Sequence, residues 1–234
     1  MLAVIVIMAL VIAVAIPTIK TVSSTALGTG ARQLSNAMML ARQYSINMRT
    51  PVRLVIATDL DVTNVVGTTG SNLVCRGYAV YYASNDLNGV VQAWWPLQDW
   101  RGLPTGVIIT EHNTSAYSPA LVVSSGGTIT PGQSPIQTAS SVYGNTTPAM
   151  TVGLNLYSTN TISIPNNSFV EFRPTGEARY IQNPIGVAAI RLAQGSVVDA
   201  KTLVWVVNDG NNWVYIEYDN TLGRVRTRYP DSYQ

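Results

Sequence analysis

The sequence has very few of the side chains that bind metal ions or act as nucleophiles. Its 234 residues include one cysteine, Cys75, and one histidine, His112. A lone cysteine excludes a disulfide within the chain, and a Cys/His zinc site needs about four ligands. A Cys–His nucleophile would use both residues and still lack the other partners of such a site. No glycine-rich loop leads into a phosphate-binding lysine. We therefore expect no enzymatic activity, no cofactor and no metal.

Charge is the second scarcity. Charged residues make up 11% of the chain, about half of the usual share, and the formal net charge is +2. This composition argues against a uniformly basic coat for nucleic acid, and the polar, nearly neutral surface that it predicts fits an extracytoplasmic head. The positively charged residues are mostly arginines, however, with twelve arginines and two lysines. Three of the arginines lie between residues 224 and 228.

Against these absences stands one long apolar run. Met1 to Ile16 contains no polar or charged side chain, Pro17 follows, and the first charge is Lys20. As a helix this stretch approaches the roughly 30 Å hydrocarbon thickness of a bilayer. Two alternatives are a buried core helix and a cleaved secretory signal, with Ala13 to Ala15 as its cleavage site, although no Lys or Arg precedes the run. We interpret the run as a retained hydrophobic helix.

Helical periodicity resumes after the proline. Apolar or small residues recur there at spacings of three and four, which predicts one buried face: Leu27, Ala31, Leu34, Met38, Ala41, Ser45 and Met48. Because proline removes a backbone hydrogen bond and crowds the preceding turn, we expect a kink near residues 13–17 rather than a break. The pattern predicts one helix of some 45 residues, apolar in its first half and amphipathic in its second, which ends before Pro51.

The rest of the chain predicts a β-rich head. Short β-branched or aromatic segments bounded by turn residues indicate strands at 52–56, 77–82, 90–95, 107–110, 169–173, 187–192, 203–207, 213–218 and 224–229. Residues 208–212 are typical of a hairpin loop between two of these strands. A loop-rich insertion is expected at about 112–165. We predict an α+β fold in which the long kinked N-terminal helix packs on an antiparallel β-sheet head.

Two segments at the amino-terminal end resemble a known family. Residues 1–17 look like the mature amino terminus of type IV pilins and type II secretion pseudopilins, where F-T-L-x-E precedes an apolar run and a proline. Aligned on Pro17, the chain begins one residue after the family's glutamate. Residues 31–52 resemble the helix-to-strand junction of the GspH/FimT branch, L-x-x-A-R-x-x-A-I-x-x-x-x-x-V. The candidates for that pattern are Leu40, Ala41, Arg42, Ile46 and Val52, with Ser45 in place of the usual alanine.

Two later segments extend the resemblance in the expected order. Phe172 to Gly176 is similar to the family's F-x-P-x-G segment, and Gly223 to Arg226 matches a G-R-x-R motif near the carboxyl end of FimT-type minor pilins. On these motifs the chain resembles the type IV pilin and type II secretion pseudopilin superfamily, GspH/FimT-like branch. The chain lacks the family's leader, cleavage site and glutamate, which indicates a trimmed chain or a start codon placed too far downstream.

The resemblance implies a filament subunit. Its helix, residues 1–50, would comprise a transmembrane and filament-core part at 1–19 and a head-packed part at 20–50, and the head would span 51–234. The implied precursor lies in the inner membrane with its head in the periplasm, and the subunit then enters a periplasmic or extracellular filament at the bacterial surface. A prepilin peptidase, methylation of the first residue, an assembly platform and other pilins or pseudopilins are the implied partners. The residues expected to pack in the filament core are Leu2, Ala3, Ile5, Ile7, Ala9, Leu10, Ile12, Ala13, Ala15 and Pro17.

The arginine motif suggests a second activity. In an extended segment, Arg224, Arg226 and Arg228 fall on the same face about 6.6 to 7 Å apart, a spacing comparable with that of phosphates along one DNA strand. Guanidinium groups bind phosphates bidentately, and the FimT resemblance favours DNA as a partner for uptake. The alternative is that these arginines pair with Glu217, Asp219 or Glu177, or with a neighbouring subunit.

Three functions therefore remain in competition on the sequence. The first is a structural subunit of a type IV pilus-like or type II secretion pseudopilus filament, which polymerises through the hydrophobic helix after prepilin processing. The second is a FimT-like minor pilin that binds extracellular DNA. The third is a secreted binding protein whose signal peptide, ending near Ala26, is removed.

Overall fold

The structure is a computed structural model, and it describes residues 2–57, 73–85, 91–113, 149–155, 158–163, 169–179, 187–199, 204–207 and 212–229. For residues 2–24 the description covers the backbone alone. The described elements are one helix and twelve strands, in the order α1 (Leu2–Met48), β1 (Val52–Ile56), β2 (Gly77–Asn85), β3 (Val91–Gly102), β4 (Val107–Asn113), β5 (Ala149–Asn155), β6 (Ser158–Ser163), β7 (Phe169–Phe172), β8 (Ala178–Arg179), β9 (Val187–Asp199), β10 (Val204–Val207), β11 (Trp213–Asp219) and β12 (Val225–Arg228).

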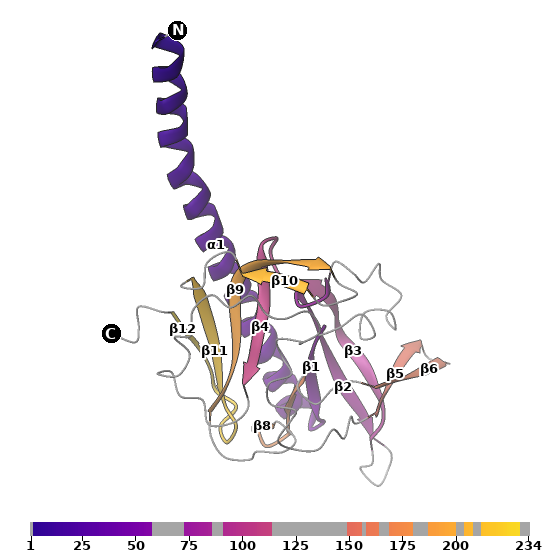
Figure 1. Cartoon of the computed structure of the whole chain (residues 1–234). Helices are drawn as coiled ribbons and strands as arrows, with labels where there is room; N and C mark the ends of the chain where they lie inside the picture. Colours follow the sequence, from indigo (N-terminus) through magenta and orange to yellow (C-terminus); the bar gives the residue numbers. More distant parts are fainter. Residues whose placement is uncertain are drawn as a thin grey trace.

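The helix α1 is 47 residues long and continues without interruption through Pro17. Its amino-terminal half projects from the head, and its carboxyl-terminal half enters it (Figure 1). It ends at Met48 because Arg49 takes a left-handed conformation, with a φ of 54°, and Pro51 follows. The predicted single long helix is therefore confirmed. Among the residues whose side chains are described, which exclude residues 2–24, no helix is long and apolar enough to cross a membrane.

The predicted buried face of α1 is correct at six of its seven positions. Residues 27, 31, 34, 38, 41 and 45 are all buried. Met48 is the exception, since 60% of its surface is exposed. The helix ends at this residue, and Arg49, with a left-handed φ, then turns the chain toward β1.

The head contains two sheets rather than the one sheet region expected. A seven-stranded sheet has the order β6-β5-β3-β2-β1-β7-β8, and a five-stranded sheet has the order β10-β9-β11-β12, with β4 paired to β9. Pairing is antiparallel except between β3 and β5, which are parallel at Trp94 and Val152. The alternation of buried residues in the sequence fits either arrangement, because it indicates which residues face a core but not how many sheets share that core.

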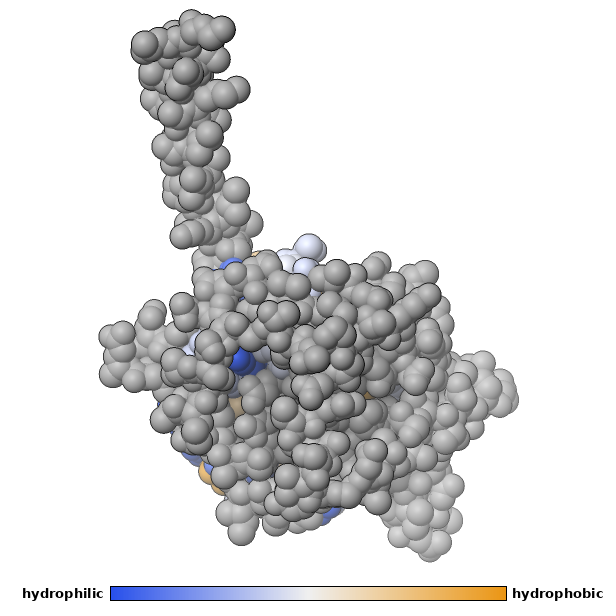
Figure 2. Space-filling view, viewed as in Figure 1, coloured by the Kyte–Doolittle hydropathy of each residue, from blue (hydrophilic) through white to orange (hydrophobic). Residues whose placement is uncertain are grey.

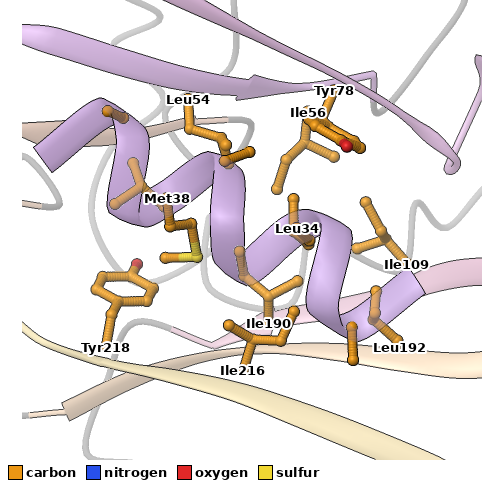
Figure 3. Close-up of a cluster of buried hydrophobic side chains, with 14 of the residues drawn as sticks. Leu34, Met38, Leu54, Ile56, Tyr78, Ile109, Ile190, Leu192, Ile216 and Tyr218 are labelled. Carbon is orange, nitrogen blue, oxygen red and sulfur yellow. The ribbon is translucent and has the colours of Figure 1, made fainter. Parts of the chain in front are cut away.

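Half of α1 lies between the two sheets and forms one core with both. Leu34 and Met38 contact a continuous cluster that includes Leu54 from the first sheet and Ile190 and Ile216 from the second. Figure 3 shows the helix between the strands, with Leu34 and Met38 pointing into the surrounding apolar side chains. Because the helix supplies the centre of this core, the head is folded around it.

Two local expectations change. Among the described residues β10 and β11 both pair with β9 and not with each other, so these two strands do not form the expected hairpin; residues 208–211 themselves lie outside the described residues. The long strand β9 binds β11 along its first half and β10 along its second. Within the expected insertion at 112–165, β5 and β6 form an antiparallel pair at the edge of the seven-stranded sheet, while residues 114–148 lie outside the described residues.

A second cluster lies on the face of the seven-stranded sheet opposite to the helix, and a partly buried ion pair lies beside it. Arg53 Nε donates to Glu171 Oε2 at 3.0 Å, and its guanidinium carbon lies 4.1 Å from the Trp94 ring centre and 4.3 Å from that of Phe169. Burial lowers the pKa of Arg53, and the charge and hydrogen bond of Glu171 oppose that shift. The guanidinium group of Arg53 therefore lies against two aromatic rings and pairs with Glu171, so its charge has favourable partners.

Removing an apolar side chain from the centre of α1 should destabilise the head strongly. We expect Leu34→Ala to lower the free energy of unfolding by about 2–5 kcal/mol, because Leu34 is fully buried between the two sheets. Leu40→Ala is the matched control, since Leu40 is 42% exposed, and it should change stability by less than about 0.5 kcal/mol. Urea denaturation in a neutral detergent measures both. Equal effects of the two substitutions would contradict the placement of α1.

Candidate functional site

The carboxyl-terminal motif is carried by a β-hairpin, which we call the arginine hairpin: β11, the turn at residues 220–224, and β12. Its strands pair antiparallel, with Glu217 opposite Arg226 and Tyr218 opposite Val225. The side chain of Asp219 shapes the turn, because its Oδ1 accepts hydrogen bonds from the backbone N–H groups of Thr221 at 2.7 Å and Leu222 at 2.9 Å. The hairpin closes where the N–H of Gly223 donates to the Asp219 carbonyl at 2.7 Å.

The three predicted arginines share one side of this hairpin. Arg224, Arg226 and Arg228 line one small pocket of about 110 Å³ together with Glu217 and Asp219. This confirms that the alternation places the arginines on a common face. Arg228 Nε donates to Glu217 Oε2 at 2.7 Å, so one arginine is in an ion pair.

Arg224 and Arg226 differ from Arg228 in their surroundings. Both are exposed, and within the described part of the chain neither has an ion pair. Arg224 and Arg226 therefore present guanidinium groups with no described ion pair, whereas the charge of Arg228 is paired with Glu217 although its side chain is 40% exposed. At the lower left margin of the head, where the turn of the hairpin lies in Figure 1, Figure 2 shows a hydrophobic residue beside hydrophilic ones.

The opposite side of the hairpin packs on the helix. Val225 is partly buried against the main core, and the Thr227 hydroxyl lies 3.2 Å from that of Ser35 on α1. Ile216 and Tyr218 on β11 are fully buried in the same core. One side of the hairpin is thus fixed to α1, while the other side displays charge to solvent.

Arg42 lies where three motifs that are separate in the sequence meet. Its Nε donates to the carbonyl oxygen of Gly176 at 3.1 Å, and the same guanidinium lies against Gly223. Arg42 belongs to the helix motif, Gly176 to the F-x-P-x-G segment and Gly223 to the G-R-x-R segment. Segments that are far apart along the chain therefore meet at one point.

Both glycines at this junction have conformations that require glycine. The φ of Gly176 is +86° and that of Gly223 is +61°. A Cβ on Gly223 would collide with the Gly176 carbonyl oxygen and would lie 2.9 Å from Arg42 Nε. The glycines in the two motifs are therefore needed because the turns pack against each other and against the helix.

Ser45 makes a second link between α1 and the same turn. Its buried hydroxyl donates to the carbonyl oxygen of Phe172 at 3.0 Å. The serine that departs from the family pattern therefore has a specific partner, since an alanine would leave that contact unmade.

A groove with a volume of about 610 Å³ runs between α1 and β12. Its lining residues are Met39, Arg42, Gln43, Ile46, Asn47, Gly223, Arg224, Val225 and Arg226. The lining contains three arginines and no acidic residue among the described side chains. Two exposed apolar side chains on the helix border it, since Met39 is 50% and Ile46 is 38% exposed. Among the residues with described side chains, no cluster of three or more His, Cys, Asp or Glu could hold a metal ion.

The residues predicted for filament packing cannot be compared in the same way. All of them lie between Leu2 and Pro17, where the backbone is helical and the side chains are outside the description. Their assembly role stays a prediction.

An N-terminal helix packed against antiparallel sheets defines the α+β fold of the type IV pilin class. The sequence model of the family described as type II transport protein GspH matches residues 30–158, more than half of the chain. The chain belongs to the GspH family, and the resemblance to the GspH/FimT-like branch of pilins and pseudopilins is thereby confirmed.

Other comparisons add little to that assignment. A crystal structure of the type IV minor pilin FimU from Pseudomonas aeruginosa strain PAO1 aligns with a TM-score of 0.40 and 10% identity, covering 88% of this chain and 90% of that one. No curated protein matches the chain at a significant level.

The sequence predicted the arginines of the hairpin, but it did not predict the helix residues that border the groove beside them. Nothing in the spacing of Met39, Gln43 and Ile46 showed that they border the arginine hairpin. The one available signal was that Arg42, a charged residue, stands beside Ala41 on the buried stripe of the helix.

Substitution by alanine should have opposite effects on stability at Gly223, where the turns meet, and at Gly28 on the helix. Gly223→Ala should lower the free energy of unfolding. A left-handed φ alone costs about 1–3 kcal/mol, and the backbone collision adds to that cost. Gly28→Ala should stabilise the protein by up to about 1 kcal/mol, since Gly28 is helical and a Cβ added there would meet nothing within 4 Å. Thermal unfolding by circular dichroism separates the two. A melting temperature that Gly223→Ala leaves unchanged would contradict the junction.

Proposed function

We propose that this protein is a structural subunit of a type IV pilus-like or type II secretion pseudopilus filament. Membership of the GspH family supports a subunit of the pilin and pseudopilin type. The observation that carries the finer proposal is the division of α1, whose second half forms the core of the head while its first half projects from it (Figure 1).

The projecting half requires an apolar environment. Its sequence from Met1 to Ile16 contains no polar side chain, so exposure of every face to water is unfavourable. Lipid meets that requirement before assembly, and the helices of neighbouring subunits meet it afterwards. In this proposal the precursor lies in the inner membrane with its head in the periplasm, and the helix later forms the filament core.

The transfer between these two environments is nearly balanced. Lipid and a bundle of apolar helices are similar in polarity, so the helix gains or loses little hydrophobic free energy when it moves. Close packing then depends on small residues that let helix backbones approach, Ala3, Ala9, Ala13 and Ala15. Leu2, Ile5, Ile7, Leu10 and Ile12 fill the space between them, and Pro17 marks the end of the packed part. Cleavage by a prepilin peptidase, methylation of the new amino terminus and extraction by an assembly platform are the steps that the family implies.

A single charge in the projecting half should prevent assembly. We expect Val6→Asp to remove the subunit from the filament fraction, because an ionised carboxylate among apolar helices costs about 2.5–3.5 kcal/mol per subunit. Val6→Leu is the conservative control and should assemble normally. The measurement is the amount of this chain in sheared surface filaments, or in purified pseudopili, relative to the membrane fraction.

Stability of the head serves as the second readout. Val6 lies outside the core that begins at Leu27, so the thermal unfolding of the head should be the same in both variants. Normal recovery of Val6→Asp in filaments would overturn the proposed role of the helix.

A second candidate function is DNA binding by the arginine hairpin. The observation that favours it is the exposure of Arg224 and Arg226 on one face without a described acidic partner. Because Arg228 is paired with Glu217, we place the phosphate contacts on the other two arginines. Two charges give weak, salt-sensitive and sequence-independent affinity.

Substitution of those two arginines tests this candidate. The double variant Arg224→Ala with Arg226→Ala should lose most of its affinity for duplex DNA, and the slope of log affinity against log salt should fall by about 2. Arg101→Ala is the control, since Arg101 is exposed on β3 in the seven-stranded sheet and not on the arginine hairpin. DNA binding that is unchanged in the double variant over a salt titration would exclude the hairpin as the site.

A further inference from the structure

The outer edge of β12 has no partner strand within the described part of the chain. Among the described strands, β12 pairs with β11 alone and ends the five-stranded sheet. The N–H of Asp219 donates to the carbonyl oxygen of Arg224 at 2.9 Å, which fixes the phase of the ladder. Because hydrogen-bonded pairs alternate along an antiparallel ladder, the peptide groups of Arg226 and Arg228 face β11, and those of Val225 and Thr227 face away from it.

The groove beside α1 lies at this outer edge. It is lined by residues of β12 and α1 but, among the described residues, by none of β11, which places it on the side of β12 away from its partner strand. Within the described part of the chain, neither Val225 nor Thr227 makes a backbone hydrogen bond to a residue outside the ladder. Exposed strand edges bind other strands readily because each unpaired N–H and C=O needs a partner.

The chemistry of the groove selects the partner. Its charges, among the described residues, are all cationic and come from Arg42, Arg224 and Arg226. Its apolar side chains are those of Met39, Ile46 and Val225. A strand added to β12 would alternate between two sides. One set of its side chains would meet the arginines on the outer face, and the other set would meet Val225 and the exposed helix.

We propose that the edge of β12 binds an extended, acidic segment of a partner polypeptide by strand addition, with carboxylates alternating with apolar side chains. Backbone hydrogen bonds to Val225 and Thr227 supply the register, and the arginines supply the selection for acidic side chains. This interaction does not require polymerisation through α1, so it can be tested independently of the filament proposal.

A second copy of this edge does not fit as the occupant. Pairing two β12 edges across a twofold axis would place Arg224 and Arg226 of one molecule beside the same residues of the other. Like charges directly opposite each other destabilise a strand pair. The chemistry therefore favours a different and acidic segment.

The test uses the full chain in a neutral detergent and a seven-residue peptide in which glutamate alternates with valine. We expect saturable binding by fluorescence polarisation, and no binding of a peptide in which lysine replaces glutamate. Methylation of alternate backbone nitrogens in the glutamate peptide should weaken binding by at least about tenfold, equivalent to about 1.4 kcal/mol, because it removes ladder hydrogen bonds without changing charge.

A proline on the edge gives the matching test on the protein. Thr227→Pro removes an N–H that faces away from β11, and edge strands tolerate proline at such positions. It should weaken peptide binding about as much as methylation does. Thr227→Ala removes the same hydroxyl contact with Ser35 but keeps the N–H, and it should bind the peptide normally.

DNA is the competing occupant, and the same variants separate it. DNA uses the arginine side chains but not the peptide groups of the edge, so Thr227→Pro should leave any DNA affinity unchanged. The proposal is overturned if the methylated peptide binds as well as the unmethylated one, if the glutamate peptide does not bind, or if DNA binds and the peptide does not. Since the methylated peptide is tested on the unaltered protein, this outcome does not depend on the folding of the proline variant.

Discussion

Burial of one face of α1 between two sheets is the constraint on which the rest of the structure depends. The core has no separate centre without Leu34 and Met38, because the cluster that joins the two sheets passes through these helix residues. The projecting half of α1 and the half that forms the core are parts of one continuous helix. A force on the amino-terminal half is transmitted directly into the core, without a flexible linker in α1.

The site is a consequence of the same packing. The arginine hairpin lies on the helix through Thr227 and Ser35, and the two turns meet at Arg42, Gly176 and Gly223. Contacts on the helix side leave Arg224 and Arg226 exposed, and they leave the outer edge of β12 without a partner among the described strands. In the proposed functions, the helix forms the filament at one end and positions the proposed binding surface at the other.

The sequence predicted the elements of this fold better than their arrangement. Helical spacing identified six of the seven buried positions on α1, and strand alternation placed Arg224, Arg226 and Arg228 on a common face. Neither pattern contains information on pairing between distant strands, so the two sheets and the central position of β9 were missed. The pairing of Arg228 with Glu217 and the meeting of three motifs at Arg42 were also hidden, because both depend on contacts between separate elements.

The central claim is that the apolar half of α1 is retained as a working part of the mature protein. The intact mass of the protein isolated from its native cell envelope tests this most directly. We expect a mature chain that still contains residues 2–26 ahead of the core residue Leu27. A mature chain that begins near Leu27 would contradict it, since that product is the one expected from a cleaved secretory signal.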